Sequence, residues 1–228
     1  MINIPKVIAI DGPSAAGKSS VGASIAQALD YPFLDTGSLY RALTWVVLRQ
    51  GIDLDNEQLL TDAAGSLKIE FYKDNDQDSG LHRIVVDGED VMPYLRDVSV
   101  EAAVSLVSRI PGVRQAQLKI QRELAGTRKI VMAGRDIGTV VVPNADLKIY
   151  LDASLTNRTR RRYEELKSIR SNLKENDVYV ELQKRDELDY KRSSSPLRPA
   201  DDAIIISTDN LSLGQVVDHI ISLIRLEN

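Results

Sequence analysis

The feature that most constrains this chain is a glycine-framed segment close to its start. It fits the pattern G-x-x-x-x-G-K-[ST], with x any residue, and reads Gly12-Pro13-Ser14-Ala15-Ala16-Gly17-Lys18-Ser19. An apolar, β-branched run at residues 7–10 comes directly before it, and a helical pattern follows. This order of strand, loop and helix disfavours the alternative interpretation, an ordinary glycine turn.

Each residue type in the segment has a task in holding a polyphosphate. Glycines allow successive backbone N–H groups to turn inward around the phosphates, the lysine meets the outer phosphates, and the serine hydroxyl ligates Mg²⁺. We therefore predict a nucleotide-binding loop that continues to Ser20, with Lys18 as a catalytic residue and Ser19 as a metal ligand.

The overall composition excludes several classes of protein. The 228 residues carry a net charge of −4, so bulk electrostatics give no reason to expect a nucleic-acid or membrane partner, and any attraction for anions must be local. Because the chain has no cysteine, a disulfide framework and a thiolate metal site are excluded. The first residues lack the pattern of a signal peptide. We expect a cytoplasmic protein, large enough to act as a monomer.

Hydrophobic periodicity predicts an α/β fold. Short apolar runs that resemble strands alternate with helical patterns, and these runs are residues 7–11, 33–35, 129–133, 147–152 and 203–207. This alternation is typical of a five-stranded parallel sheet flanked by helices. Four of the runs end in polar residues, and ligands of such sheets bind beyond the carboxyl ends of the strands. We therefore expect the chemistry at that edge.

The stretch at residues 61–105 interrupts the alternation. It contains strand candidates at residues 67–72 and 82–86, joined by an acidic polar run at residues 73–80. A calcium loop built on Asp74, Asp76 and Asp78 is disfavoured because the glycine and the distal glutamate that it needs are misplaced. We predict a single domain over residues 1–228, with a core at about 1–60 and 106–228 and a small β-containing insertion between them.

A first basic cluster follows the strand candidate at residues 147–152. On a helix, Arg158, Arg161 and Arg162 share one face, where guanidinium groups could close over transferring phosphates. The alternative is a solvated helix face on which these arginines pair with Glu164 and Glu165.

Two further clusters contain basic and acidic residues together. Arg185, Asp189 and Arg192 lie at i, i+4 and i+7, which would be one stripe of a single helix, able to hold a sugar hydroxyl and a phosphate or to form a salt-bridge ladder. Arg135 and Asp136 follow the run at residues 129–133, and Arg114 falls in a helix that begins near residue 110. Taken singly, each of these could be structural.

Together these motifs resemble the bacterial cytidylate kinase family over essentially the whole chain. The phosphate loop is common to many families, so the resemblance depends on more specific segments: Leu34-Asp35-Thr36-Gly37-Ser38-Leu39-Tyr40-Arg41, Ile110-Pro111-Gly112-Val113-Arg114 and Ala133-Gly134-Arg135-Asp136-Ile137-Gly138-Thr139-Val140-Val141. The resemblance implies Mg²⁺-assisted transfer of the γ-phosphoryl group of ATP to CMP or dCMP. It also implies that the insertion binds the nucleoside monophosphate and that residues 154–175 form a short arginine lid.

The resemblance also implies roles for individual residues. The phosphate loop with Ser20 would hold ATP, and Arg158 and Arg162 would be catalytic lid arginines. Arg41, Arg135 and Arg192 resemble the residues that hold the acceptor phosphate. Arg185 and Asp189 resemble the pair on the sugar, while the base would be read by Ser105, Arg114, Asp136 and the hydroxyl of Thr36. Cytosine suits this set because it offers an amino donor beside acceptors at N3 and O2.

Two departures and two alternatives accompany the resemblance. Ala15 stands where the family often has glycine, and Ser207-Thr208-Asp209 differs from the usual Asp-Thr pair, so nothing is predicted for the ATP-base side. A kinase for UMP or dTMP on the same fold is one alternative. A GTP-binding switch is the other, but the guanine-reading tetrapeptide Asn-Lys-x-Asp is missing from the sequence.

Overall fold

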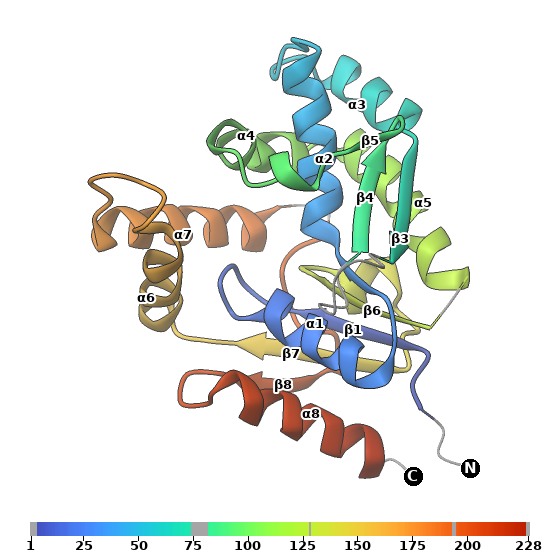
Figure 1. Ribbon diagram of the computed structural model, residues 1–228, viewed down its shortest axis with the longest axis vertical. Helices are drawn as coiled ribbons and strands as arrows, with labels where there is room; N and C mark the ends of the chain where they lie inside the picture. The colour runs from blue at the N-terminus through green and yellow to red at the C-terminus, as the bar shows by residue number, and fades with distance from the viewer. Residues whose placement is uncertain (1–3, 74–81, 128, 193–194, 227–228) are drawn as a thin grey trace.

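A five-stranded parallel sheet forms the centre of the protein (Figure 1). The computed structural model describes residues 4–73, 82–127, 129–192 and 195–226. The strands lie in the order β2-β6-β1-β7-β8, and their bounds are β1 Val7–Asp11, β2 Phe33–Asp35, β6 Ile130–Gly134, β7 Leu147–Asp152 and β8 Ile204–Ser207. The predicted parallel sheet is confirmed; β6 is displaced by one residue from its predicted range, and β8 begins one residue later than predicted.

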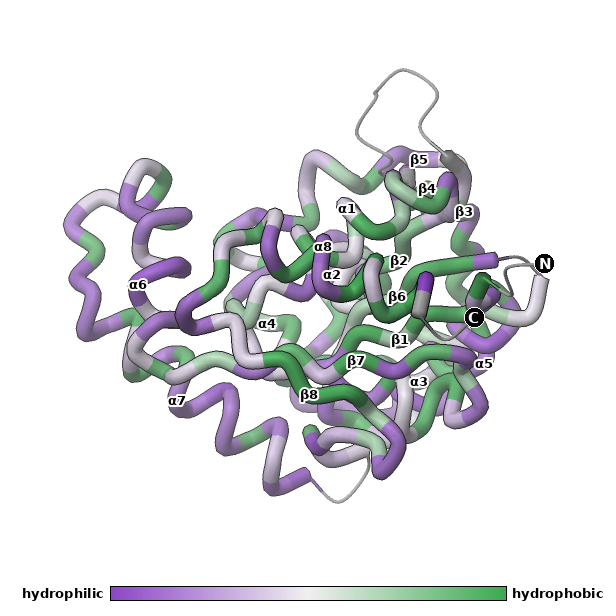
Figure 2. Tube along the Cα trace, turned by 90° about the horizontal axis from the view of Figure 1, so that it is seen from below, coloured by the Kyte–Doolittle hydropathy of each residue, from purple (hydrophilic) through white to green (hydrophobic). Residues whose placement is uncertain are grey.

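Helices cover both faces of this sheet. On one face lie α1 (Lys18–Leu29) and α8 (Leu213–Leu226), and on the other lie α2 (Thr36–Arg49) and α5 (Pro111–Thr127). Along the central strand β1, Ile8 and Ile10 join the core under α1 and α8, whereas Ala9 joins the opposite core. This alternation is the period of two expected of a strand that is buried on both faces. Figure 2 shows the apolar character of the central strands.

The predicted insertion contains a small antiparallel sheet of three strands, β3 (Ile69–Lys73), β4 (His82–Val86) and β5 (Glu89–Asp90). β4 has its predicted range. β3 begins two residues later and ends one residue later than predicted, and β5 was not predicted. Phe71 and Ile84 lie opposite each other and belong to the same apolar cluster as Leu34 of the central sheet. The insertion therefore shares its core with the main body. Most of the predicted acidic loop, including Asp74, Asp76 and Asp78, lies outside the described residues.

The remaining helices are α3 (Glu57–Ser66), α4 (Val98–Ser108), α6 (Leu155–Leu166) and α7 (Glu175–Lys191), and a 3₁₀ turn lies at Met92–Tyr94. α3 packs against α5, α4 packs against α2, and α6 packs against α7. Figure 1 shows α6 and α7 extending to one side of the molecule, and Figure 2 shows that both are largely hydrophilic. Within the described ranges, none of the helices is both long and apolar enough to cross a membrane.

A short π-helix, Ile137–Val141, follows β6 and was not predicted. Its first two N–H groups are bound by a carboxylate far away in the sequence: Ile137 N donates to Asp11 Oδ1 at 2.8 Å, and Gly138 N donates to Asp11 Oδ2 at 2.7 Å. The turn depends on this long-range acceptor, which hydrophobic periodicity does not reveal.

Candidate active site

A cavity of about 1080 Å³ opens at the carboxyl edge of the central sheet. Its lining includes thirteen lysine and arginine residues but only six aspartate and glutamate residues among those described. The cavity is therefore positively charged, although the whole chain carries −4. The sequence predicts that any attraction for anions must be local, and this cavity provides such a local positive charge.

The predicted phosphate loop lies between β1 and α1 and borders this cavity. Gly12 has φ +148°, and a Cβ atom there would lie 2.1 Å from the carbonyl oxygen of Leu151. Gly17, the N-cap of α1, has φ +94°. Both framing glycines therefore occupy conformations that L-residues rarely adopt. Ala15 has φ +60°, so the alanine accepts the left-handed conformation that a glycine would hold at less cost.

The part of the predicted loop from Ser14 to Ser20 lines the cavity, whereas Gly12 and Pro13 are not among the described residues that line it. Lys18 is buried, and its Nζ donates to the carbonyl oxygen of Pro13 at 2.6 Å. Burial, followed by the nearby Arg135 guanidinium, lowers the pKa of Lys18 well below its ordinary value. An anionic phosphate beside Nζ would stabilise the charged amine, so the residue is suited to a polyphosphate.

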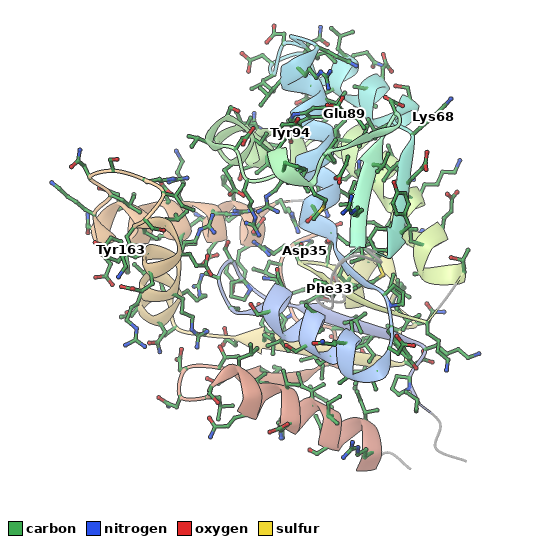
Figure 3. The ribbon with its side chains drawn as sticks, viewed as in Figure 1. Phe33, Asp35, Lys68, Glu89, Tyr94 and Tyr163 are labelled. Carbon is green, nitrogen blue, oxygen red and sulfur yellow. The ribbon has the colours of Figure 1, made fainter. Side chains whose placement is uncertain are left out.

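Ser19 meets a carboxylate that was not predicted as a site residue. Its hydroxyl donates to Asp35 Oδ2 at 2.7 Å, and the other carboxylate oxygen of Asp35 accepts from Gly37 N at 2.9 Å. Figure 3 shows Asp35 at the junction of β2 and α2. Burial would raise the pKa of Asp35, but the Arg41 guanidinium and the Ser19 hydroxyl hold it below its ordinary value.

This pair of oxygen groups fits Mg²⁺. The ion is usually held by one or two protein oxygens together with substrate phosphates and water. Among the described residues, no group of three or more His, Cys, Asp or Glu side chains could hold a metal ion. Ser19 and Asp35 are therefore the protein groups that would hold Mg²⁺ when a nucleotide supplies the remaining ligands.

Carboxylates hold the arginines that were predicted to bind the acceptor phosphate. Arg41 Nε donates to Glu101 Oε1 at 2.7 Å. Asp189 accepts from Arg135 Nε at 2.8 Å and from Arg192 Nη1 at 3.4 Å. These bonds fix the guanidinium planes and leave other N–H groups available to a phosphate.

The prediction of one helical stripe with Arg185, Asp189 and Arg192 is correct only in part. Arg185 lies within α7 and lines the cavity, where burial and the neighbouring Arg135 and Arg41 lower its pKa to about 10. The prediction that Arg192 continues the same helix is wrong: α7 ends at Lys191, and Arg192 has extended backbone angles of φ −64° and ψ 138°. Its side chain still returns to Asp189 across the helix end.

The predicted base-reading residues also come together at the cavity. Arg114 and Asp136 form a buried ion pair through Arg114 Nη2 and Asp136 Oδ2. The Thr36 hydroxyl donates to the carbonyl oxygen of Ala133 at 3.0 Å, and Ser105 lines the cavity from α4. The guanidinium carbon of Arg114 also lies 5.6 Å from the centroid of the Tyr40 ring, a neighbour that was not predicted.

The two predicted lid arginines occupy different surroundings. Arg162 lines the cavity and pairs with Glu165 at 3.0 Å, as the solvated-face alternative expects, but also with Glu101 at 3.4 Å. Arg158 is buried and is not among the described residues that line the cavity. Its Nη1 donates to the carbonyl oxygen of Ser14 at 3.2 Å and lies 2.6 Å from Asp186 Oδ2. In this conformation, Arg158 supports the phosphate loop from behind.

Asp11 was noted in the sequence only as a polar residue at a strand end. It is buried, and it binds the N–H groups of Ile137 and Gly138, directly after Arg135 and Asp136. Burial outweighs these two hydrogen bonds and raises its pKa from an ordinary value of 3.8 to about 6. The carboxyl group of Asp11 therefore changes charge in the folded protein at a pH where it is already ionised in the unfolded chain.

This raised pKa predicts how stability depends on pH. Because the folded state binds the proton more tightly, the stabilisation is fully present below a pH of about 4 and is lost as the pH rises through about 6. At about 1.4 kcal/mol per pKa unit, the loss is roughly 3 kcal/mol. Urea unfolding of the wild-type protein and the Asp11→Asn variant, from about pH 4 to 7, measures it. As the pH rises, the wild-type protein should lose stability relative to the Asp11→Asn variant. A difference in the free energy of unfolding that stays constant with pH would contradict the raised pKa.

Comparison with known proteins agrees with the geometry of the cavity. The family model "Cytidylate kinase" matches residues 8–226. A cytidylate kinase from Caldanaerobacter subterraneus subsp. tengcongensis is 43% identical over 99% of this chain and 97% of its own length. One from Chloroflexus aggregans is 46% identical over 95% of this chain and 92% of its own, and one from Pseudomonas fluorescens is 41% identical over 100% and 99%. The chain therefore belongs to the cytidylate kinase family.

Proposed function

We propose that the protein transfers the γ-phosphoryl group of ATP to CMP or dCMP, with Mg²⁺ bound to the donor. The observation that carries this proposal is the set of side chains that line one cavity. The phosphate loop, with Lys18 and Ser19, lines the same cavity as the Arg114–Asp136 pair. A donor polyphosphate and an acceptor base therefore have complementary groups within a single space.

On the donor side, N–H groups at the start of α1 and the Lys18 amine bind the ATP phosphates. The Ser19 hydroxyl would hold Mg²⁺ together with Asp35, whose Oδ2 lies 2.7 Å from the Ser19 Oγ. When bound, the ion neutralises charge that develops on the β- and γ-phosphate oxygens. Arg158 keeps the loop in shape through the carbonyl oxygen of Ser14.

On the acceptor side, Arg41, Arg135 and Arg192 hold the monophosphate, while Arg185 and Asp189 bind the sugar hydroxyls. Most of these residues lie outside residues 61–105. Ser105 and Glu101 of α4 close the site from that insertion, which we propose as the part that binds the nucleoside monophosphate. Residues 154–175 form the lid, since α6 carries Arg162 into the cavity.

Base selection follows from the Arg114–Asp136 pair. The pair presents a guanidinium donor directly beside a carboxylate acceptor. Cytosine presents the complementary edge, an acceptor at N3 beside an amino donor, whereas uracil presents N3–H beside a carbonyl oxygen. The relatives named above are cytidylate kinases, which favours cytosine over the alternative UMP or dTMP acceptor.

The reaction needs positioning and charge stabilisation more than it needs a base. The acceptor oxygen belongs to a phosphate that is already anionic at neutral pH, so no proton must be removed before the attack. Arg162 approaches the charge that forms on the equatorial oxygens during transfer, and the other arginines align the acceptor for in-line attack.

Base choice gives the first test of this proposal. With UMP at least one buried polar group stays unpaired, at a cost of about 1–3 kcal/mol. CMP should therefore exceed UMP in kcat/KM by roughly tenfold to a hundredfold or more. Asp136→Asn should shrink this ratio by harming CMP, whereas Arg135→Ala should affect all monophosphates alike. Steady-state kinetics with CMP, dCMP, UMP and AMP measure it. Equal use of CMP and UMP by the wild-type enzyme would reject the cytosine-reading assignment.

The lid gives a second test, which separates its two arginines. Arg162→Ala should lower kcat by about a hundredfold with little effect on equilibrium CMP binding or on stability, because the exposed pair with Glu165 contributes little and Glu101 keeps Arg41 and Arg96 as partners. Arg158→Ala should instead lower the free energy of unfolding by about 3 kcal/mol, since it leaves Asp186 buried without its partner. Single-turnover rates, CMP calorimetry and urea unfolding measure these effects. An Arg158→Ala variant as stable as the wild type would show that the ion pair with Asp186 is dispensable.

A further inference from the structure

One carboxylate in the lining of the cavity contacts arginines from three different parts of the fold. Glu101 lies in the first turn of α4, and its side chain is only 9% exposed. Its Oε1 accepts from Arg41 Nε at 2.7 Å and from Arg96 Nη1 at 3.4 Å. Its Oε2 accepts from Arg162 Nη2 at 3.4 Å. A single carboxylate thus joins arginines from α2, from the turn before α4 and from α6.

The charge of Glu101 is stabilised in this position. Burial would raise its pKa, but Arg41 first, and then Arg96 and Arg162, hold the pKa below its ordinary value. The group is therefore an anion at neutral pH, surrounded by cations inside a positively charged cavity. A buried ion pair of this kind fixes the geometry of its partners more than it stabilises the fold.

Two of the three arginines that Glu101 joins have different tasks in the proposed reaction. Arg41 is assigned to the phosphate of the acceptor, and Arg162 is assigned to the lid that acts on the transferring phosphoryl group. Because Glu101 uses Nε of Arg41 and a single Nη of Arg162, each guanidinium keeps N–H groups for substrate oxygens. Without Glu101, the exposed Glu165 would be the remaining ion-pair partner of Arg162 among the described residues.

We propose that Glu101 is a positioning residue that ties the lid arginine Arg162 to the acceptor-site arginine Arg41, so that Arg162 is held beside the acceptor phosphate that Arg41 binds. This inference rests on the proposed function. It also predicts opposite effects on binding and turnover. As an anion beside the acceptor phosphate, Glu101 repels that phosphate, but it holds Arg162 where transition-state charge develops.

The test is a double-mutant cycle of Glu101→Gln and Arg162→Ala. Glutamine keeps the size of the side chain but loses the charge, and its amide can direct N–H groups towards Arg162. We expect kcat to fall about tenfold while the KM for the acceptor stays constant or falls. In the Arg162→Ala background, Glu101→Gln should have little further effect on kcat, because the group that it positions is gone.

The matched control is Glu165→Gln, which removes the other carboxylate partner of Arg162. Its pair is solvent-exposed, with the Glu165 side chain 60% exposed, so kcat should stay within about twofold of wild type. A purely structural role of Glu101 would raise KM and give independent, additive losses in the cycle. Either outcome would overturn the proposal.

Two additions keep the test decisive. If Glu101→Gln does not fold, Glu101→Asp replaces it in the cycle. Aspartate keeps the charge, but its side chain is one methylene group too short to span Arg41 and Arg162. We therefore expect kcat to fall in this variant too, and the loss to be coupled to Arg162.

The cycle is measured with whichever nucleoside monophosphate the wild-type enzyme phosphorylates best. A preferred acceptor other than CMP or dCMP would overturn the proposed function alone, and additive losses would overturn the role of Glu101 alone. The absence of any phosphoryl transfer would overturn both.

Discussion

The whole site depends on the position of β1 between β6 and β7. Parallel pairing places Asp11 opposite Gly134 on one side and opposite Tyr150 on the other, so the loops that follow these strands leave the sheet at the same edge. The phosphate loop thereby emerges next to Arg135 and Asp136. Two hydrogen bonds from the backbone after Asp136 to the Asp11 carboxylate then join the donor and acceptor sides directly.

A second constraint is the concentration of positive charge in the cavity. Guanidinium groups at close quarters repel one another, and burial together with the neighbouring Arg135 and Arg41 lowers the pKa of Arg185. The protein counters this repulsion with largely buried carboxylates. Asp189 binds Arg135 and Arg192, and Glu101 binds Arg41. Outside the cavity, Asp186 binds Arg158 in the same way. Each carboxylate both neutralises and orients the cations around it, which prepares the site for anionic substrates before they bind.

The features that local sequence determines could be predicted. The phosphate loop is a contiguous motif, and the strands of the central sheet are short apolar runs, so both were found to within a residue or two. The resemblance to a known family also supplied residues that are distant in sequence. The structure brings Arg114 and Asp136 together, although 22 positions separate them.

Features that depend on long-range contacts could not be predicted. The π-helix at Ile137–Val141 needs an acceptor 126 positions away, and the position of Arg158 behind Ser14 needs a contact over 144 positions. Glu101 gave no signal because a single glutamate on an amphipathic helix is typical of a solvated surface. The extended backbone at Arg192 was missed because a helical stripe was continued one residue past the real helix end.

The central claim is that the phosphate loop and the Arg114–Asp136 pair bind two nucleotides in one cavity. A crystal structure with ADP, Mg²⁺ and CMP tests it most directly. The account predicts the ADP β-phosphate on the N–H groups at the start of α1, the CMP phosphate on Arg41 and Arg135, and the cytosine amino group on Asp136. CMP bound elsewhere, or a cytosine ring that makes no hydrogen bond to Arg114 or Asp136, would contradict it.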